Sequence, residues 1–126
     1  MIEKKVVTGE GIPQSHLPFS PAIQSGNYLF ISGQASVNSQ GKIVPGTFEE
    51  ECRRSFENLR AILQGVGLDF SDLVQVRNYV GKQENLESFN NIYREYFSNP
   101  YPARTTLIGC LGDLLKFEVD AIAFIK

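Results

Sequence analysis

The residues with the clearest chemical potential lie in the last quarter of the chain. Arg104 is the second residue of the run "ARTTLI", which follows two prolines, and Glu118 and Asp120 interrupt the apolar segment "FEVDAIAFI". A guanidinium can hold a carboxylate through two parallel hydrogen bonds, and a glutamate can orient a water or move a proton. The pattern indicates an anion pocket, although a salt bridge at a strand edge would use the same residue types.

Alternation along two predicted strands places these side chains. Because successive residues of a strand point to opposite faces, Arg104 and Thr106 share one face, and Glu118 and Asp120 share a face of the next strand. A short loop joins the two segments, so we expect them to be antiparallel neighbours. Arg104 is then a candidate partner for Glu118.

Composition excludes several other kinds of site. The chain has 126 residues, a net charge of −2 and an isoelectric point near 5.4, which suits one domain over residues 1–126 and gives nucleic acid no electrostatic support. One histidine, His16, and two cysteines outside any CxxC motif are too few for a zinc site. We expect Cys52 and Cys110 to be reduced, buried thiols.

The N-terminus shows no targeting signal. It lacks the apolar stretch of a signal peptide, and no apolar run approaches the roughly 18 residues that span a bilayer. We therefore expect a cytoplasmic protein that does not enter the membrane.

Helical spacing and caps predict two helices. Thr47 and Glu50 form a capping-box pattern at the start of a helix over residues 47–64. The apolar residues Phe48, Cys52, Phe56, Leu59, Ile62 and Leu63 recur along one face of that helix. Asn85 is expected to cap a second helix, which Pro100 and Pro102 prevent from continuing far beyond residue 97.

β-Branched and aromatic segments predict the strands. They cover residues 3–8, 27–32, 42–44, 73–80, 104–110 and 115–125, with Gly33 ending the second. This order fits an α+β fold in which one mixed sheet carries both helices on the same face. The other face needs its own cover, and we expect a homo-oligomer to provide it through Tyr28, Phe30, Val74, Val76, Ile122 and Phe124.

Six segments together resemble the Rid (YjgF) family. They are "ISGQ", "SFENLRAIL", "GLDFSDLVQVRNYV", "FNNIYREYF", "YPARTT" and "FEVDAIA", which occur in that order over nearly the whole chain. The resemblance implies a fold similar to the small trimeric type of chorismate mutase and a homotrimer with clefts between subunits. It also implies cofactor-free hydrolysis of enamines and imines, such as 2-aminoacrylate, to 2-keto acids and ammonia.

The resemblance also assigns roles to four residues. Arg104 stands where the family binds the substrate carboxylate, and Glu118 where an acid positions water or exchanges protons. Gly33 matches a glycine whose backbone faces the substrate, and Asn90 matches a cleft asparagine.

Two positions depart from the family pattern. Ala22 replaces a tyrosine of the N-terminal loop, and Thr106 replaces a cysteine of the substrate pocket. Phe19 or His16 could close the pocket instead. These changes leave open a binding module for a small carboxylate or a partner protein without turnover, while the acidic chain and its single histidine give an endoribonuclease little support.

Overall fold

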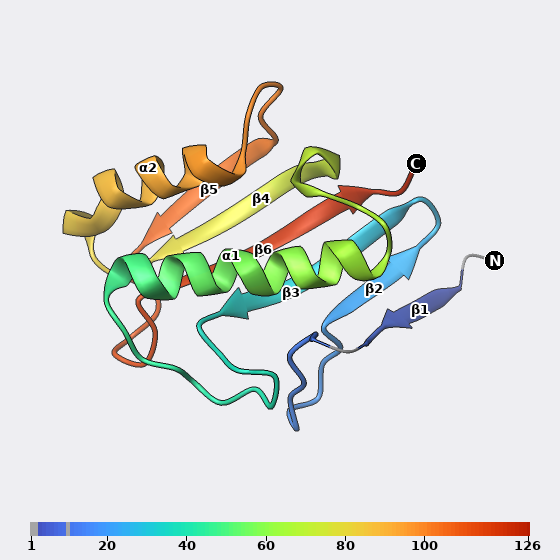
Figure 1. Cartoon of the computed structure of the whole chain (residues 1–126), viewed down its shortest axis with the longest axis horizontal. Coiled ribbons are helices and arrows are strands. Elements are labelled where there is room, and N and C mark those ends of the chain that lie inside the picture. The colour runs from blue at the N-terminus through green and yellow to red at the C-terminus, as the bar shows by residue number, and fades with distance from the viewer. Residues whose placement is uncertain (1–2, 10) are drawn as a thin grey trace.

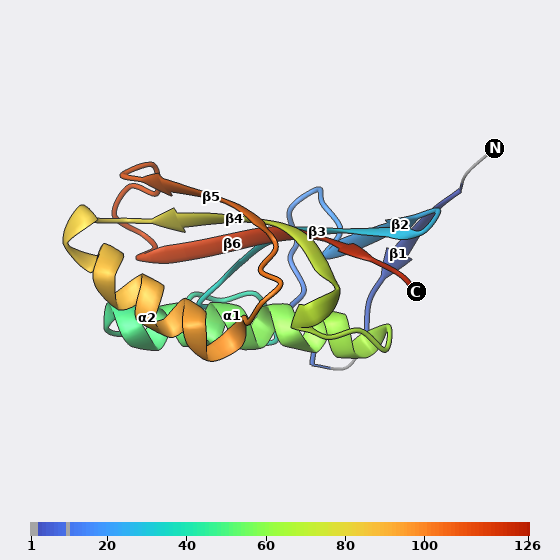
Figure 2. The same ribbon diagram turned by 90° about the horizontal axis from the view of Figure 1, so that it is seen from above.

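The computed structural model describes residues 3–9 and 11–126, which form one mixed sheet covered by two helices. The elements in chain order are β1 (Lys4–Val7), β2 (Ala22–Ser25), β3 (Tyr28–Ala35), α1 (Phe48–Gly65), β4 (Leu73–Val80), α2 (Leu86–Tyr96), β5 (Ala103–Ile108) and β6 (Phe117–Phe124). The strand order is β1-β2-β3-β6-β4-β5. Both helices lie on the same face, as Figures 1 and 2 show, which confirms the expected α+β class.

Helix α1 begins where its cap predicts. The Thr47 side chain accepts from the Glu50 backbone N–H at 3.1 Å, and the Glu50 carboxylate accepts from the Thr47 N–H at 2.8 Å. This reciprocal pair satisfies two N–H groups that the first turn cannot bond internally. All six apolar residues expected on its inner face are buried.

The core fills the space between this helix face and the sheet. Phe56 is completely buried and lies within 5.3 Å, centroid to centroid, of Phe117 from β6. Phe117 in turn lies 5.5 Å from Phe89 of α2. Aromatic pairs at these separations add to the apolar area that each ring buries. They join both helices to the central strand β6.

Helix α2 connects two parallel strands. It follows β4 and precedes β5, and these two strands pair in parallel. Asn85 precedes its first residue, as expected, but the Asn85 side chain makes no capping hydrogen bond. A 3-10 turn over Gln83–Asn85 enters the helix instead, so the prediction of a side-chain cap was wrong.

The N-terminal half of the sheet differs from the prediction. Strand β2 pairs with β1 and β3 but was not expected, because "AIQS" is too short for a clear pattern. Residues 42–44 form only an isolated bridge between Val37 and Ile43 rather than a strand. Gly33 does not end β3, which continues to Ala35.

A bulge lets β3 continue past Gly33. Ile31 pairs with Ala121 and Gln34 pairs with Val119, so Ser32 and Gly33 together oppose the single residue 120. Such an extra residue bends a strand and re-aims its side chains, and it is common beside functional sites.

The position of β6 corrects the expected neighbourhood of Arg104 and Glu118. Strand β6 lies between β3 and β4 and is antiparallel to both, whereas β5 forms the outer edge beyond β4 (Figure 1). The loop after β5 therefore passes the C-terminal end of β4 to reach β6, with Gly109 bonded to Val80 and Gly81 bonded to Lys116. The two strands are not adjacent, so the prediction of an antiparallel β5–β6 pair was wrong.

The face of the sheet opposite the helices remains uncovered within the described residues. Tyr28, Phe30, Val74 and Phe124 are between 40% and 46% exposed there. Val76 was expected among them but is completely buried beneath the helices, because a register shift between Leu73 and Gln75 changes the alternation of β4. This uncovered surface is called the open face below.

One cysteine also departs from expectation. Cys52 is buried in α1, whereas Cys110 is exposed in the loop after β5. No helix within residues 3–9 and 11–126 is both long enough and apolar enough to cross a bilayer.

Candidate functional site on two faces of the sheet

Arg104 lies on the helix side of the edge strand β5. It pairs in register with the buried residue Val76, so its side chain turns toward α2. There its Nη2 atom donates to Asn90 Oδ1 at 2.9 Å. Its guanidinium carbon lies 5.0 Å from the centre of the Phe89 ring and 4.8 Å from that of Tyr93. The neutral amide and two rings position the cation without neutralising it.

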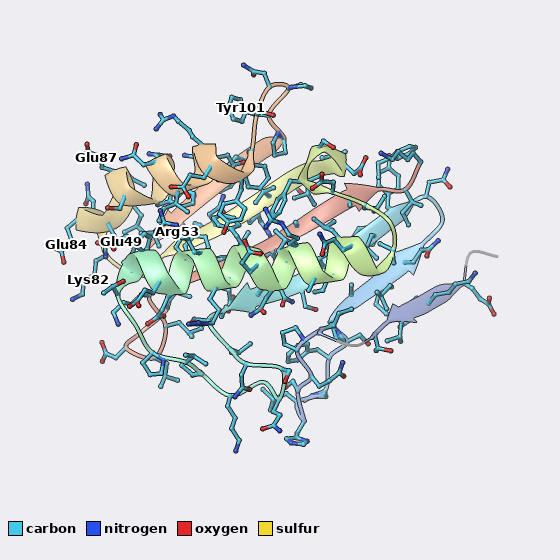
Figure 3. The ribbon with its side chains drawn as sticks, viewed as in Figure 1. Glu49, Arg53, Lys82, Glu84, Glu87 and Tyr101 are labelled. Carbon is cyan, nitrogen blue, oxygen red and sulfur yellow. The ribbon has the colours of Figure 1, made fainter. Side chains whose placement is uncertain are left out.

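A cavity of about 400 Å³ opens beside this arginine. Its lining consists of Asn90, Tyr93, Arg94, Tyr101, Pro102 and Arg104. Tyr101 lies in the loop between α2 and β5 (Figure 3). No carboxylate within residues 3–9 and 11–126 forms a salt bridge with Arg104. The remaining guanidinium donors are available to an anion, which is the chemistry expected from the sequence.

Polar atoms without a protein partner gather near this arginine. Thr106 lies two residues along the same face of β5, and its hydroxyl oxygen is buried without a hydrogen bond to any described residue. Asn78, its neighbour in β4, is completely buried, and both polar atoms of its side chain are equally unpaired. The Tyr93 hydroxyl is a third such group, and burial raises the pKa of Tyr93 to about 12. No pattern in the sequence indicated this concentration of unpaired polar groups.

Glu118 lies on the open face. It alternates with the buried residues Phe117 and Val119 along β6, so its side chain points away from the helices. A second cavity, of about 410 Å³, is lined by Phe19, Ile31, Ser32, Gly33, Arg77, Glu118 and Asp120. Partial burial, and next the Asp120 carboxylate, raise the pKa of Glu118. A carboxyl with a raised pKa keeps its proton to higher pH than usual, which suits it to proton exchange with a substrate.

Gly33 lets the backbone of β3 lie close to the Glu118 carboxylate. A Cβ atom at this position would lie 2.7 Å from Glu118 Oε2, which is closer than real Cβ contacts. Only glycine therefore leaves the carboxylate its place beside the bulge. The neighbouring Ser32 hydroxyl donates to the Ser20 carbonyl at 2.6 Å. This bond ties the N-terminal loop to the bulge and explains why Phe19 reaches the cavity.

The other residues of the N-terminal loop take different places. Ala22 is buried at the start of β2 and is not part of the lining around Glu118. His16 is exposed in the loop. Of the two aromatic side chains considered for closing the pocket, the structure brings Phe19 to the cavity.

Arg77, Tyr79 and Asp120 form a network that the sequence analysis missed. Arg77 Nε donates to Asp120 Oδ1 at 2.8 Å, and the Tyr79 hydroxyl donates to Oδ2 at 2.7 Å. The hydrogen bond to Asp120 raises the pKa of Tyr79 to about 12, so this phenol stays a donor. The alternation of "VQVRNYV" already placed residues 77 and 79 on one face, but only the pairing of β4 with β6 puts them against Asp120.

The two halves of the expected site do not meet within one chain. Arg104, Asn90 and Thr106 lie on the helix side of the sheet, whereas Gly33 and Glu118 lie on the open face. Strand β4 also separates β5 from β6. The expectation that Arg104 directly partners Glu118 was wrong for a single chain, because the sheet itself stands between them.

A larger cavity lies away from both groups. It measures about 560 Å³ and adjoins the N-terminal ends of the two helices, where Glu49, Lys82 and Glu84 gather (Figure 3). Its lining mixes both signs of charge and contains none of the expected site residues. In the described part of the chain, no group of three or more His, Cys, Asp or Glu side chains could hold a metal ion.

Comparison with known proteins relates the chain to one family along almost its full length. Residues 10–125 match the family described as Endoribonuclease L-PSP. A RutC family protein of Pyrococcus horikoshii is 34% identical over 96% of this chain and 98% of its own length. A mouse protein named 2-iminobutanoate/2-iminopropanoate deaminase is 32% identical over 97% of this chain and 92% of its own length.

The fold agrees with the sequence comparison. A crystal structure described as a putative endoribonuclease from Thermotoga maritima superposes with a TM-score of 0.89 at 32% identity, covering 98% of this chain and 99% of the other. The match to the family spans nearly every element described above, and the relatives are matched over nearly their full length. The chain therefore belongs to the Rid family, also described as Endoribonuclease L-PSP.

Proposed function

We propose that this protein hydrolyses small imines and enamines bearing a carboxylate, releasing 2-keto acids and ammonia. The observation that carries the proposal is the presence of two half-sites in the chain, one with an arginine that no carboxylate neutralises and one with a half-buried carboxyl of raised pKa. The mouse relative named 2-iminobutanoate/2-iminopropanoate deaminase supports this class of reaction. The reaction is proposed to proceed without a cofactor or metal ion.

The two half-sites require two copies of the chain. Because Arg104 and Glu118 lie on opposite sides of the sheet, we propose that Arg104 of one copy docks over Glu118 of the next. A contact between two different surfaces closes into a ring when the rotation between copies allows it. The proposed ring is a homotrimer with three clefts.

The open face supports this association. Its exposed side chain Phe30 lines a hollow that shares Ser32, Arg77 and Asp120 with the cavity of Glu118, and the neighbouring rings of Tyr28 and Phe124 lie further along the same face. Contiguous exposed apolar groups of this kind commonly mark protein–protein contacts. Burying them against a neighbouring copy would also remove water from the cleft, which strengthens the charge interactions inside it.

The proposed reaction is addition of water to the imine followed by elimination of ammonia. Arg104 holds the substrate carboxylate, which turns an encounter into a fixed geometry. Glu118 orients a water whose oxygen adds to the imine carbon, while a proton passes to the nitrogen. The C–N bond of the resulting carbinolamine then breaks, ammonia leaves and a second proton transfer completes the keto group. One water is consumed for each ammonia released.

Imine decay is the direct test. An amino-acid oxidase generates the imine in situ, and its loss is followed with and without the protein. Arg104→Ala should remove the acceleration, whereas Arg53→Ala, which alters an exposed arginine paired with Glu95 between the helices (Figure 3), should retain it. Equal decay with and without wild-type protein would refute the proposal.

Mixing two inactive variants tests the shared cleft. Trimers reassembled from equal amounts of Arg104→Ala and Glu118→Ala contain clefts with both native groups. Random assembly into rings restores at most about a quarter of the wild-type activity, since each cleft draws one residue from each of two copies. No recovery in verified mixed trimers would show that the two groups do not act across copies.

The altered residues favour one alternative function. Thr106 and Ala22 replace a cysteine and a tyrosine of the resembled pattern, so the same cleft could hold a small carboxylate without turning it over. Saturable binding of 2-keto acids that depends on Arg104, together with no imine hydrolysis, would establish that alternative. The endoribonuclease name of the family predicts RNA cleavage, which the net charge of −2 does not favour.

A further inference from the structure

The cavity around Glu118 contains its own arginine. Arg77 belongs to β4 and lines the same 410 Å³ cavity as Glu118 and Gly33. Its side chain is 56% exposed, so the guanidinium remains accessible from the open face. It is directly opposite Asp120 in the antiparallel register of β4 and β6.

Asp120 holds this guanidinium by one atom only. Arg77 Nε donates to Asp120 Oδ1 at 2.8 Å. The other oxygen, Oδ2, already accepts from the Tyr79 hydroxyl at 2.7 Å. Because Tyr79 occupies that position, the carboxylate does not receive the second bond of the usual two-point pairing. The two Nη atoms of Arg77 make no hydrogen bond to any residue among 3–9 and 11–126.

Another arginine of the chain shows the ordinary arrangement. Arg53 donates to both oxygens of Glu95, from Nε at 3.3 Å and from Nη2 at 2.8 Å. Its side chain is exposed to a similar degree, 46% against 56% for Arg77. The two pairs differ in the second carboxylate oxygen, which accepts from Arg53 in Glu95 but accepts from Tyr79, not Arg77, in Asp120. Arg77 is therefore oriented by its partner while keeping its outer edge free.

We propose that Arg77 is a second anion-binding residue in the cleft of Glu118 and that the preferred substrates carry two carboxylates. This inference rests on the proposed function, in which Arg104 of a neighbouring copy completes the cleft. Arg104 then holds the carboxylate next to the imine carbon, and Arg77 holds the carboxylate at the end of the side chain. Asp120 and Tyr79 are positioning residues that act through Arg77.

The charged groups that line the cavity agree with this role. The lining contains two carboxylates, Glu118 and Asp120, and one guanidinium. Asp120 is committed to Arg77 and Tyr79, and partial burial, and next Asp120, raise the pKa of Glu118. A ligand carboxylate at the Nη edge of Arg77 therefore meets a cation whose nearest competing anion is already engaged.

Binding of keto acids tests the inference apart from catalysis. Titration calorimetry compares 2-oxoglutarate, which has two carboxylates, with 2-oxobutanoate, which has one. A charge-assisted hydrogen-bonded contact predicts roughly 10- to 100-fold tighter binding of the dicarboxylate to the wild type. Arg77→Gln should abolish that preference while leaving the affinity for 2-oxobutanoate within about twofold.

Three further variants separate recognition from a simple surface charge. Arg53→Gln removes an arginine of similar exposure and should keep the full preference. Tyr79→Phe frees Asp120 Oδ2, so Arg77 can turn its Nη edge onto Asp120 and the preference should fall. Circular dichroism melting confirms that each variant folds, and Arg77→Lys, which keeps the charge without the fork, should restore only part of the preference.

The outcomes distinguish the two proposals. Equal wild-type affinity for both keto acids, or equal weakening of both by Arg77→Gln, would overturn the role of Arg77 and leave imine hydrolysis standing. A dicarboxylate preference that depends on Arg77, found in a protein that hydrolyses no imine, would support the anion site and refute the proposed reaction.

Discussion

Replacing Gly33 by alanine should damage the proposed reaction without unfolding the protein. The new Cβ would lie 2.7 Å from Glu118 Oε2 and 2.9 Å from its Cδ. Ordinary van der Waals contact begins at 3.4 Å, so the carboxylate has to retreat by about 0.7 Å (3.4 − 2.7). The substitution adds no backbone strain, because Gly33 is not among the glycines with positive φ.

The magnitude follows from the geometry of positioned groups. A displacement of about 1 Å at a reacting centre can lower a rate by roughly 100-fold. The obstructing atoms are the end of a flexible side chain in an open cavity, so they can move without disturbing the core. We expect kcat for imine hydrolysis to fall roughly 10- to 100-fold and the free energy of unfolding to change by less than about 1 kcal/mol.

Gly46→Ala provides a matched control. A Cβ there would lie 3.0 Å from Glu50 Oε1, so it also presses on a glutamate carboxylate. That carboxylate belongs to the capping box of α1 and not to the cleft. We expect a loss of about 0.5–1 kcal/mol in the free energy of unfolding and an unchanged kcat. Urea unfolding and imine decay measured on the same preparations separate the two effects.

Two results would refute the reasoning. A Gly33→Ala protein with wild-type kcat would show that the position of the Glu118 carboxylate does not limit the reaction. A protein with lost activity and an equally lost melting transition would show that Gly33 supports the fold rather than the acid. A crystal structure of the variant would report the displacement directly.

Three further predictions concern buried or half-buried polar groups. The pKa of Glu118 is raised by burial and by Asp120, so between the unfolded and folded pKa values the native state binds more protons and stability falls as pH rises. Glu118→Gln should therefore remove that decline in urea unfolding, and an identical pH dependence would contradict it. Glu51 is 2% exposed and accepts hydrogen bonds from the backbone and the side chain of Lys116. Glu51→Gln should therefore lower the free energy of unfolding by about 1–3 kcal/mol, and an unchanged urea midpoint would contradict this. Asn78→Leu should raise the melting temperature, since both polar atoms of Asn78 are buried without a protein partner; a lower one would show that the amide is satisfied by solvent or ligand.

Local signals in the sequence were sufficient for helix α1 and strand β4. The capping box at Thr47 and Glu50 located the start of α1, because a helix end is decided by neighbours three residues apart. The β-branched run of residues 73–80 became β4 with the same bounds. These features depend on contacts within a few residues, so the chain order alone contains them.

Non-local pairing decided what the sequence could not. The strand order places β6 inside the sheet and β5 at its edge, and no local pattern distinguishes this from a hairpin of the two. The bulge at Ser32 and Gly33 depends on the register with β6, as does the network of Arg77 and Tyr79 on Asp120. Short loops permit several pairings, and only burial of the whole apolar face selects one.

The sequence by itself determined the family, the fold class and the residue types available for chemistry, because motifs and periodicity are properties of neighbouring residues. Tertiary structure decided where those residues act. It put Arg104 on the helix side and Glu118 on the open face, since alternation fixes a side only once a strand's partners are known. This separation is the physical reason for expecting a cleft between copies of the chain.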